Sequence, residues 1–288
     1  MKDFPIPVRS IGPGSQVEEE ALAYMPMPQG METFRAPVLA EPEELALRHQ
    51  AHAALRDALE QLERVCFDGI NRRVDLRGLD MDNLALVNQV LGEGEVSARV
   101  QHDGEPRREL HIQESVFAGV WRVVGSTDGR VETDQIEIGP IPDALKAVAR
   151  ADVLAGMRRW NGPLPPNVQN APALLAEIEE QWRAWKPGQP AHVVNLTLLP
   201  MSVEDIGFLD HHLGTGRVLI LSRGYGNCRI TNTQMPHCWR VVYYNSQDVV
   251  ILNTVEVSEL PEVAQAARED LEDSRQRLKE VLEWVMQA

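Results

Sequence analysis

The sequence has few cysteines and lacks any long apolar run. Its three cysteines, Cys66, Cys228 and Cys238, are an odd number and do not form a disulfide framework, which predicts a reducing compartment with the cytoplasm as the default. No apolar stretch approaches the roughly 20 residues of a membrane helix, and the chain does not begin with the charged-then-apolar pattern of a secretory signal. We therefore expect a soluble cytoplasmic protein without membrane insertion.

Basic side chains are also scarce. The chain has 28 Lys and Arg against 43 Asp and Glu, a formal net charge of −15. General binding to phosphate backbones depends on clustered Lys and Arg, so we do not expect a nucleic-acid partner. A basic peptide is a more natural partner for such an acidic chain.

Residues 1–41 lack the apolar periodicity that a helix or a strand would need. Prolines and glycines recur through this segment, and three methionines stand among prolines in MPMPQGM at 25–31. We interpret residues 1–41 as an extended N-terminal arm. Two alternatives stay open: a disordered leader, or an arm that docks on its own body or on a partner.

The main feature that the sequence does contain is an internal repeat. LGEGEV at 91–96 matches LGTGRV at 213–218, an offset of 213 − 91 = 122, and WRVV at 121–124 matches WRVV at 239–242, an offset of 239 − 121 = 118. Flanking pieces match in the same order: VDL at 74–76 with VNL at 194–196, and IPDALKAVA at 141–149 with LPEVAQAAR at 260–268. We interpret the chain as a duplicated structural unit.

The residue patterns in each copy predict an α+β fold. Runs of β-branched and aromatic residues between Gly, Asn, Ser and Pro clusters are typical of short antiparallel strands joined by tight turns, one of them expected near 120–125. Apolar residues at helical spacing predict flanking helices at 203–213, from Pro142 to about Trp160 and from Pro261 almost to the end. We expect two tandem pseudo-symmetric repeats, each an antiparallel sheet of about four strands packed with helices. The expected boundaries are the arm at 1–41, a first repeat at 42–160 and a second at 161–288, divided by the breaker-rich NGPLPPN at 161–167.

The second copy carries the residues best suited to a metal. Imidazole and thiol side chains, which nickel or zinc would favour, gather in one predicted sheet: His211, His212, Cys228, His237 and Cys238. The first copy has aliphatic residues where the second has cysteines, and a glycine where the second has His237. Because free cysteine behaves as a small buried hydrophobe, this favours core cysteines over a metal site or a redox pair. We predict no metal, with Cys228, His237 and Cys238 as the remaining candidates.

No catalytic motif is present. Asp210, His211 and Ser222 are near one another, but no Gly-x-Ser-x-Gly turn accompanies them. The glycine-rich GTGRVLILSRGYG lacks the lysine and hydroxyl residue of a phosphate-binding loop. We expect no catalytic residues, no cofactor and no enzymatic activity.

Residues that only the second copy has mark a candidate binding surface. RGYGN at 223–227 replaces the longer, charged HDGEPRRE at 102–109, and two tyrosines replace the glycine and serine at positions 125 and 126. Exposed Tyr and Arg beside a strand edge are typical anchors for a peptide or protein. We predict that a protein partner contacts Arg223, Tyr225, Asn227, Tyr243 and Tyr244. The alternative is that these tyrosines only complete the sheet.

Three segments resemble one known family. MPMPQGMETFRAPVLAEPEE at 25–44, RGYGNCRITNT at 223–233 and WRVVYYNSQDVVILNTVEVSELPEVAQAAREDLEDSRQRL at 239–278 are similar to the HupH/HyaF family of nickel-iron hydrogenase maturation proteins. The resemblance runs from about residue 20 to the end and is strongest in the second copy.

The resemblance implies a non-enzymatic assembly chaperone for an uptake hydrogenase. In this family the expected client is the precursor of the small, iron-sulfur subunit, and the expected helper is a thioredoxin-like accessory protein. The alternative that the family implies is nickel incorporation or metal delivery to the large subunit. The resemblance supplies no catalytic residues. An acidic body with a tyrosine-bearing sheet fits the chaperone better than metal delivery.

Overall fold

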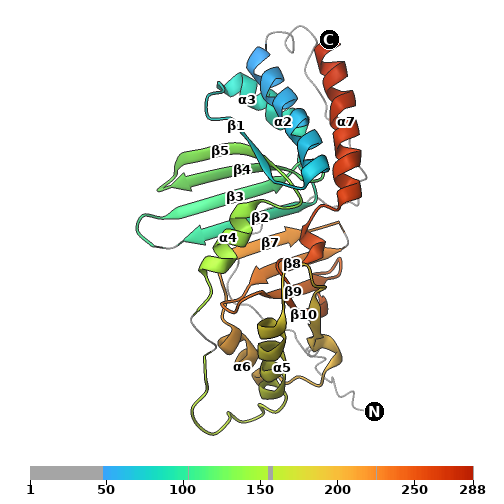
Figure 1. Cartoon of the computed structure of the whole chain (residues 1–288). Helices are drawn as coiled ribbons and strands as arrows, with labels where there is room; N and C mark the ends of the chain where they lie inside the picture. Colours follow the sequence, from blue (N-terminus) through green and yellow to red (C-terminus); the bar gives the residue numbers. More distant parts are fainter. Residues whose placement is uncertain (1–47, 103, 155–157, 225, 288) are drawn as a thin grey trace, which may run out of the picture.

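The fold is organised around one antiparallel sheet. The computed structural model describes residues 48–102, 104–154, 158–224 and 226–287, so the predicted arm and Tyr225 lie outside the described residues. The sheet has ten strands in the order β1-β5-β4-β3-β2-β7-β8-β9-β10-β6 (Figure 1). The strands are β1 (Arg72–Asp75), β2 (Val96–His102), β3 (Arg108–Glu114), β4 (Val120–Thr127), β5 (Arg130–Ile138), β6 (His192–Asn195), β7 (Val218–Ser222), β8 (Asn227–Asn232), β9 (Cys238–Tyr244) and β10 (Val250–Val257).

The helices are divided between the two ends and the middle of this sheet. Helices α2, α3 and α7 lie at one end, α5 and α6 at the other, and α4 over the middle (Figure 1). The helical elements are α2 (His49–Asp68), α3 (Met81–Leu91), α4 (Asp143–Ala151), α5 (Ala171–Ala184), η1 (Leu196–Leu198), α6 (Val203–Leu213), η2 (Glu262–Ala264) and α7 (Arg268–Gln287). Of the helices that the structure describes, none combines the length and apolarity needed to cross a bilayer.

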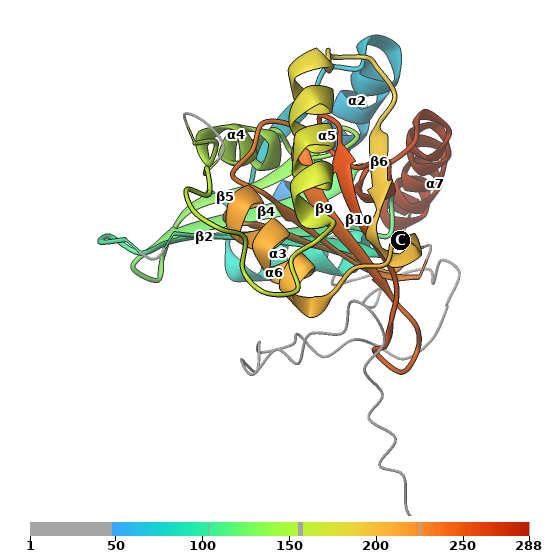
Figure 2. The ribbon, with the colours of Figure 1, turned by 90° about the horizontal axis from the view of Figure 1, so that it is seen from below.

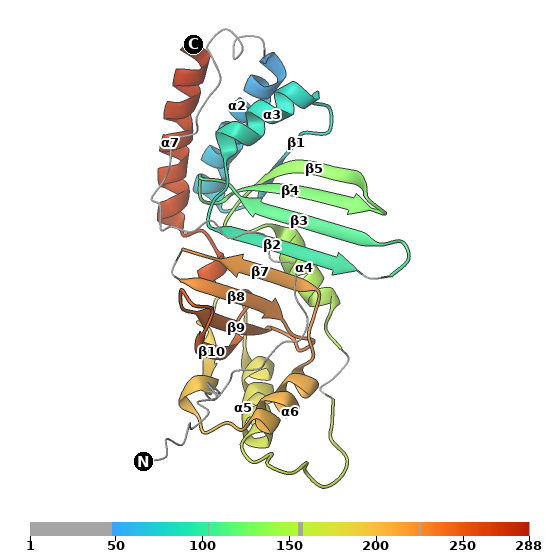
Figure 3. The ribbon, with the colours of Figure 1, turned by 180° about the vertical axis from the view of Figure 1, so that it is seen from behind.

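The strand order is the same when it is counted from either edge. We call β1–β5 with α2–α4 the first half, and β6–β10 with α5–α7 the second half. In each half a short strand lies at the outer edge, the next four strands form a meander, and the first meander strand lies at the centre. The central strands β2 and β7 pair with each other in antiparallel register, side by side in Figure 3 with α4 behind them.

Alternation along the strands divides the core between the two faces of the sheet. On one face, a central cluster spans both halves and contains the two tryptophans of the repeated WRVV motif, Trp121 and Trp239, with Ile141 and Leu145 from the segment around α4. On the opposite face, one cluster lies under α2, α3 and α7 and another under α5 and α6. Helices α4 and α6 accordingly lie on opposite sides of the strands (Figure 2).

The two closing segments cross between the halves. Helix α7 comes from the second half, yet Leu271, Leu278 and Leu282 are buried in the first half's core cluster against α2. Helix α4 comes from the first half, and Leu145 packs in the central cluster with residues of β7. The two halves therefore share their apolar cores.

The structure corrects two expectations about the elements. The two predicted four-stranded sheets are one ten-stranded sheet, because β2 and β7 satisfy each other's unpaired backbone groups, and because a short strand, β1 or β6, is added at each outer edge. The helix expected over 142–160 ends at Ala151, and the one expected from Pro261 begins with the short η2 and resumes as α7 at Arg268.

Candidate functional site

The predicted surface residues separate onto the two faces of the sheet. Asn227 lies opposite Tyr244 in the β8–β9 ladder, and Cys228 lies opposite Tyr243. Because neighbouring residues of a strand point to opposite faces, Tyr243 and Tyr244 cannot contribute to one surface. Arg223 follows β7 directly, where its backbone N–H donates to the carbonyl oxygen of Glu95 at 3.1 Å. The alternation places Arg223, Asn227 and Tyr244 on one face.

The face that carries Tyr244 is half-exposed across the centre of the sheet. Ser97 on this face is buried, whereas the side chains named below are of intermediate exposure, and none of those belongs to the three buried clusters. We call this surface the central face, and it consists of Arg99, Leu219, Leu221, Arg223, Asn227, Arg229, Val242 and Tyr244. It combines aliphatic side chains with arginines and one tyrosine, in a chain whose overall charge is strongly negative.

Tyr243 lies on the opposite face and is part of the core boundary. It packs against the central cluster, and its hydroxyl is hydrogen-bonded to the thiol of Cys228. Burial raises the pKa of Tyr243 to about 12, and burial raises the pKa of Cys228 to about 12 as well. Tyr243 therefore lies on the other face from Arg223, Asn227 and Tyr244, and its contact with a partner stays a prediction.

The candidate metal ligands do not come together. Cys228 is buried in the central cluster, whereas Cys238 is buried on the other face in the cluster under α5 and α6. The ring of His237 lies on that of Trp185 with centroids 4.4 Å apart. Within the described ranges, no group of three or more His, Cys, Asp or Glu side chains is arranged to hold a metal ion.

A small cavity lies beside His237. Its volume is about 160 Å³, and its lining comes from the end of α4 and from the loop between β8 and β9. Burial lowers the pKa of His237, with a further contribution from Arg150. The lining is mainly apolar, with Lys146, Arg150 and Glu259 as its charged members.

The Asp210, His211 and Ser222 grouping is not a catalytic arrangement. The hydroxyl of Ser222 donates to the carbonyl oxygen of Val263 at 3.3 Å, while Asp210 forms an ion pair with Arg240 at 3.2 Å. Ser222 therefore contacts η2 on one face of the sheet, whereas Asp210 contacts Arg240 of β9 on the opposite face.

Each half anchors a helix to its sheet through one arginine at the same position. In the first half, Arg122 pairs with Asp134 and donates from Nε to Asn88 Oδ1 on α3 at 3.1 Å. In the second half, Arg240 pairs with Asp210 on α6. Burial lowers the pKa of both arginines, to about 10 for Arg122.

The second half exchanges the positions of the Asn and the Asp that surround this arginine. Asn88 corresponds to Asp210 at the offset of 122, and Asp134 corresponds to Asn253 through the β4–β5 and β9–β10 registers. The amide is on the helix in the first half and on the strand in the second. Each arginine therefore has one carboxylate partner in its own half.

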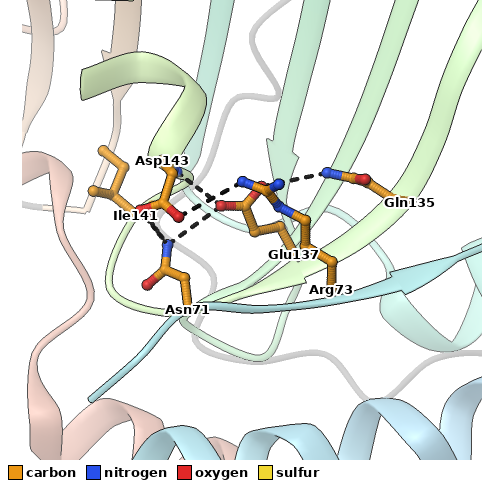
Figure 4. Close-up of polar contacts among 6 residues, drawn as sticks. All are labelled: Asn71, Arg73, Gln135, Glu137, Ile141 and Asp143. Atoms are coloured by element: carbon orange, nitrogen blue, oxygen red, sulfur yellow. Dashed lines mark hydrogen bonds and ion pairs between the residues drawn. The ribbon is translucent and has the colours of Figure 1, made fainter. Parts of the chain in front are cut away.

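A buried carboxylate on the first half's outer strands was missed by reasoning from the sequence. Glu137 is fully buried and accepts hydrogen bonds from Arg73 Nε at 3.1 Å, from Asn71 Nδ2 at 3.3 Å and from the backbone N–H of Asp143 at 2.8 Å (Figure 4). Its counterpart in the second half is Glu256, which has a different environment. At the offset of 260 − 141 = 119 between IPDALKAVA and LPEVAQAAR, IEI at 136–138 matches VEV at 255–257, and this match is the sequence signal that could have found it.

Comparison with known proteins identifies the class. The family model described as "HupH hydrogenase expression protein, C-terminal conserved region" matches this chain twice, at residues 49–163 and 168–285. The hydrogenase expression/formation protein HoxQ of Cupriavidus necator is 56% identical, with 99% of each chain covered. HupH of Rhodobacter capsulatus is 46% identical, also with 99% of each covered. The hydrogenase-1 operon protein HyaF of Escherichia coli is 34% identical, with 96% of each covered.

These relatives define a class of hydrogenase expression and formation proteins. The chain belongs to the HupH/HyaF family of this class. The family resemblance expected from the sequence is confirmed. A role as an accessory protein of hydrogenase formation follows from the names of these relatives.

Proposed function

We propose that the chain is a non-enzymatic chaperone of nickel-iron hydrogenase assembly. In this proposal it holds the precursor of the iron-sulfur small subunit, together with a thioredoxin-like accessory protein. The names of the relatives support the hydrogenase context. The composition of the central face supports a holding role, and that is the observation on which the proposal rests.

The central face has the chemistry of a protein-binding surface. Leu219, Leu221 and Val242 supply apolar area, and Arg229 and Tyr244 belong to the two residue types most enriched at binding hot spots besides tryptophan. Several of its residues lie on neighbouring strands in register, so the surface is continuous across β7, β8 and β9. Surfaces of this kind bind by excluding water around a few anchors.

The two halves differ at this face. At the offset of 122, Ser97 corresponds to Leu219 and Arg99 to Leu221; at 118, Ser126 corresponds to Tyr244. We infer that a duplicated unit kept polar residues in its first copy and gained apolar and aromatic ones in its second. This asymmetry favours a client that docks mainly on the second half.

Co-purification tests the proposal. A tagged chain is expressed with the hydrogenase structural genes, and the small-subunit precursor is measured in the eluate. Leu221→Ser combined with Tyr244→Ala is expected to reduce capture at least about tenfold, since a pair of hot-spot residues contributes more than 1.4 kcal/mol. Tyr243→Phe is the matched control on the opposite face and is expected to leave capture unchanged. Equal capture by the double variant and the control would exclude the central face.

A further inference from the structure

Glu137 and Glu256 occupy the same place in the two halves. Arg73 lies opposite Glu137 in the β1–β5 ladder, and Val193 lies opposite Glu256 in the β10–β6 ladder. Both pairs lie on the outermost two strands of the sheet, one at each end. The first half therefore serves as a template for what surrounds a carboxylate at this position.

In the first half two carboxylates hold one arginine. Arg73 donates from Nε to Glu137 at 3.1 Å, and its Nη2 lies 3.6 Å from Asp143 Oδ2. Figure 4 shows the Arg73 guanidinium beside the Glu137 carboxylate, with Asp143 and Asn71 nearby and dashed lines marking the contacts. A planar guanidinium suits this arrangement because its donors reach two acceptors at once.

The second half keeps both carboxylates and lacks the arginine. Asp143 corresponds to Glu262 in the matched segments IPDALKAVA and LPEVAQAAR, and Glu262 lies close enough to Glu256 to raise its pKa further, after the larger effect of burial. Val193 replaces the arginine. The second half thus has both carboxylates without the cation that bridges them in the first half.

The remaining contacts of Glu256 do not neutralise it. The hydroxyl of Thr254 lies 3.3 Å from Glu256 Oε1, and alanine at position 191 stands where the first half has the Asn71 amide. Within the part of the chain that the structure describes, no Lys or Arg forms an ion pair with Glu256. A half-exposed carboxylate in this setting favours a cation from outside.

The entrance to this position is apolar. Val193 is 50% exposed on the edge strand β6, and the alkyl part of an arginine would lie across it. Tyr243 is on the same face and lies near enough to influence Glu256 electrostatically. The net charge of −15 attracts a basic segment over a longer range.

We propose that Glu256 and Glu262 bind an arginine side chain of a partner protein, which crosses Val193 and occupies the position that Arg73 occupies in the first half. The site is separate from the central face, because it lies on the opposite side of the sheet at its outer edge. The proposal stands whether or not the client is a hydrogenase subunit.

Restoring the arginine within the chain is the first test. Val193→Arg recreates the pair seen in the first half and is expected to raise Tm by about 2 °C, the effect of one favourable ion pair in a chain of this size. Glu256→Gln in the Val193→Arg background removes that gain, whereas Val193→Gln alone does not produce it. A Val193→Arg variant that melts no higher than Val193→Gln would contradict a poised carboxylate pair.

Peptide binding is the second test. The probe is the capped tripeptide Ac-Val-Arg-Val-NH2. Its binding is monitored by NMR through the side-chain carboxyl resonances of ¹³C-labelled glutamate in the full chain. The arginine peptide is expected to lower the pKa of Glu256, the lysine analogue to bind at least threefold more weakly, and the citrulline analogue not to bind. Both Glu256→Gln and Val193→Arg should abolish the response.

Two further results would overturn the proposal. One is an equal response to the arginine and citrulline peptides, because citrulline keeps the shape and loses the charge. The other is a free chain that is dimeric and becomes monomeric on Val193→Arg in sedimentation, because an arginine of a second copy would then be the occupant.

Discussion

Ala98 of β2 lies directly opposite Ile220 of β7, and these two residues are also equivalent in the repeat, since 98 + 122 = 220. Val96 lies opposite Ser222, and Val100 lies opposite Val218. In the repeat Val96 is equivalent to Val218 and Val100 to Ser222, so the register is symmetric about the pair Ala98 and Ile220. A pseudo-twofold axis therefore passes between Ala98 and Ile220. Both side chains are buried in the central cluster.

Truncating Ile220 is expected to destabilise both halves together. Ile220 is fully buried, and Ile→Ala in a core costs about 2–5 kcal/mol. Because the central cluster contains residues of both halves, urea unfolding of Ile220→Ala, followed by tryptophan fluorescence, should stay a single transition at a lower midpoint. Leu219→Ala changes the neighbouring residue on the half-exposed face. It is the control and is expected to lower the free energy of unfolding by less. Separate transitions for the two halves would show that they unfold independently.

The exchanged positions of Asn and Asp around Arg122 and Arg240 predict a compensating pair of substitutions. Asp134→Asn leaves a largely buried arginine without a carboxylate and should cost about 3 kcal/mol. Adding Asn88→Asp gives the first half the arrangement of Arg240 and Asp210, so the double variant should recover most of this loss. A double-mutant cycle in urea measures the coupling. Additive losses would mean that the helix residue does not contact the arginine in solution.

Glu114 predicts a pH dependence of stability. Burial raises its pKa from 4.5 to about 7, with smaller contributions from Glu95 and Asp270. The folded chain therefore binds more protons than the unfolded chain between about pH 4.5 and 7, and this residue's contribution to stability falls as the pH rises through that window. The full loss amounts to roughly 3 kcal/mol.

Glu114→Gln should remove this slope. The amide oxygen can still accept from the backbone N–H of Gly119, which donates to Glu114 at 3.1 Å. We expect the variant to match the parent near pH 4.5 and to be more stable at pH 8, measured by urea unfolding at both values. A parent and variant with parallel pH profiles would show that Glu114 titrates normally.

The cysteines are expected to be unreactive in the folded chain. Burial raises the pKa of Cys228 and of Cys238 to about 12, and burial also raises the pKa of Cys66. Because the thiolate is the reactive form, modification by DTNB should be slow until urea unfolds the chain. Nickel and zinc should be substoichiometric in the purified protein. Stoichiometric metal that is lost on Cys238→Val, which mirrors Val120 of the first half, would support the metal-delivery alternative instead.

Most elements could be predicted from the sequence because their signals are local. The strand at 120–127 and the helix at 203–213 were placed within two residues, since periodicity and turn residues mark both ends. The joining of the two sheets was not predicted. It depends on pairing between Val96–Val100 and Val218–Ser222, which are far apart in the chain, and nothing local distinguishes an edge strand from a central one.

The candidate surface was predicted in part for a similar reason. Comparing the copies identified Arg223, Asn227 and Tyr244, which the structure places on one face, although their role in binding stays a prediction. Tyr243 was predicted with them, but it lies on the other face because adjacent residues of a strand point to opposite faces. The division at residues 160 and 161 also stays a prediction.

The origin of α7 has a consequence for the way this protein is made. Leu278 and Leu282 complete the core around α2, yet they are synthesised after every strand of both copies. Until α7 has been translated, the N-terminal half exposes the apolar face of α2 and cannot finish folding. Translation of α7, rather than the emergence of the first copy, is the event that completes this core.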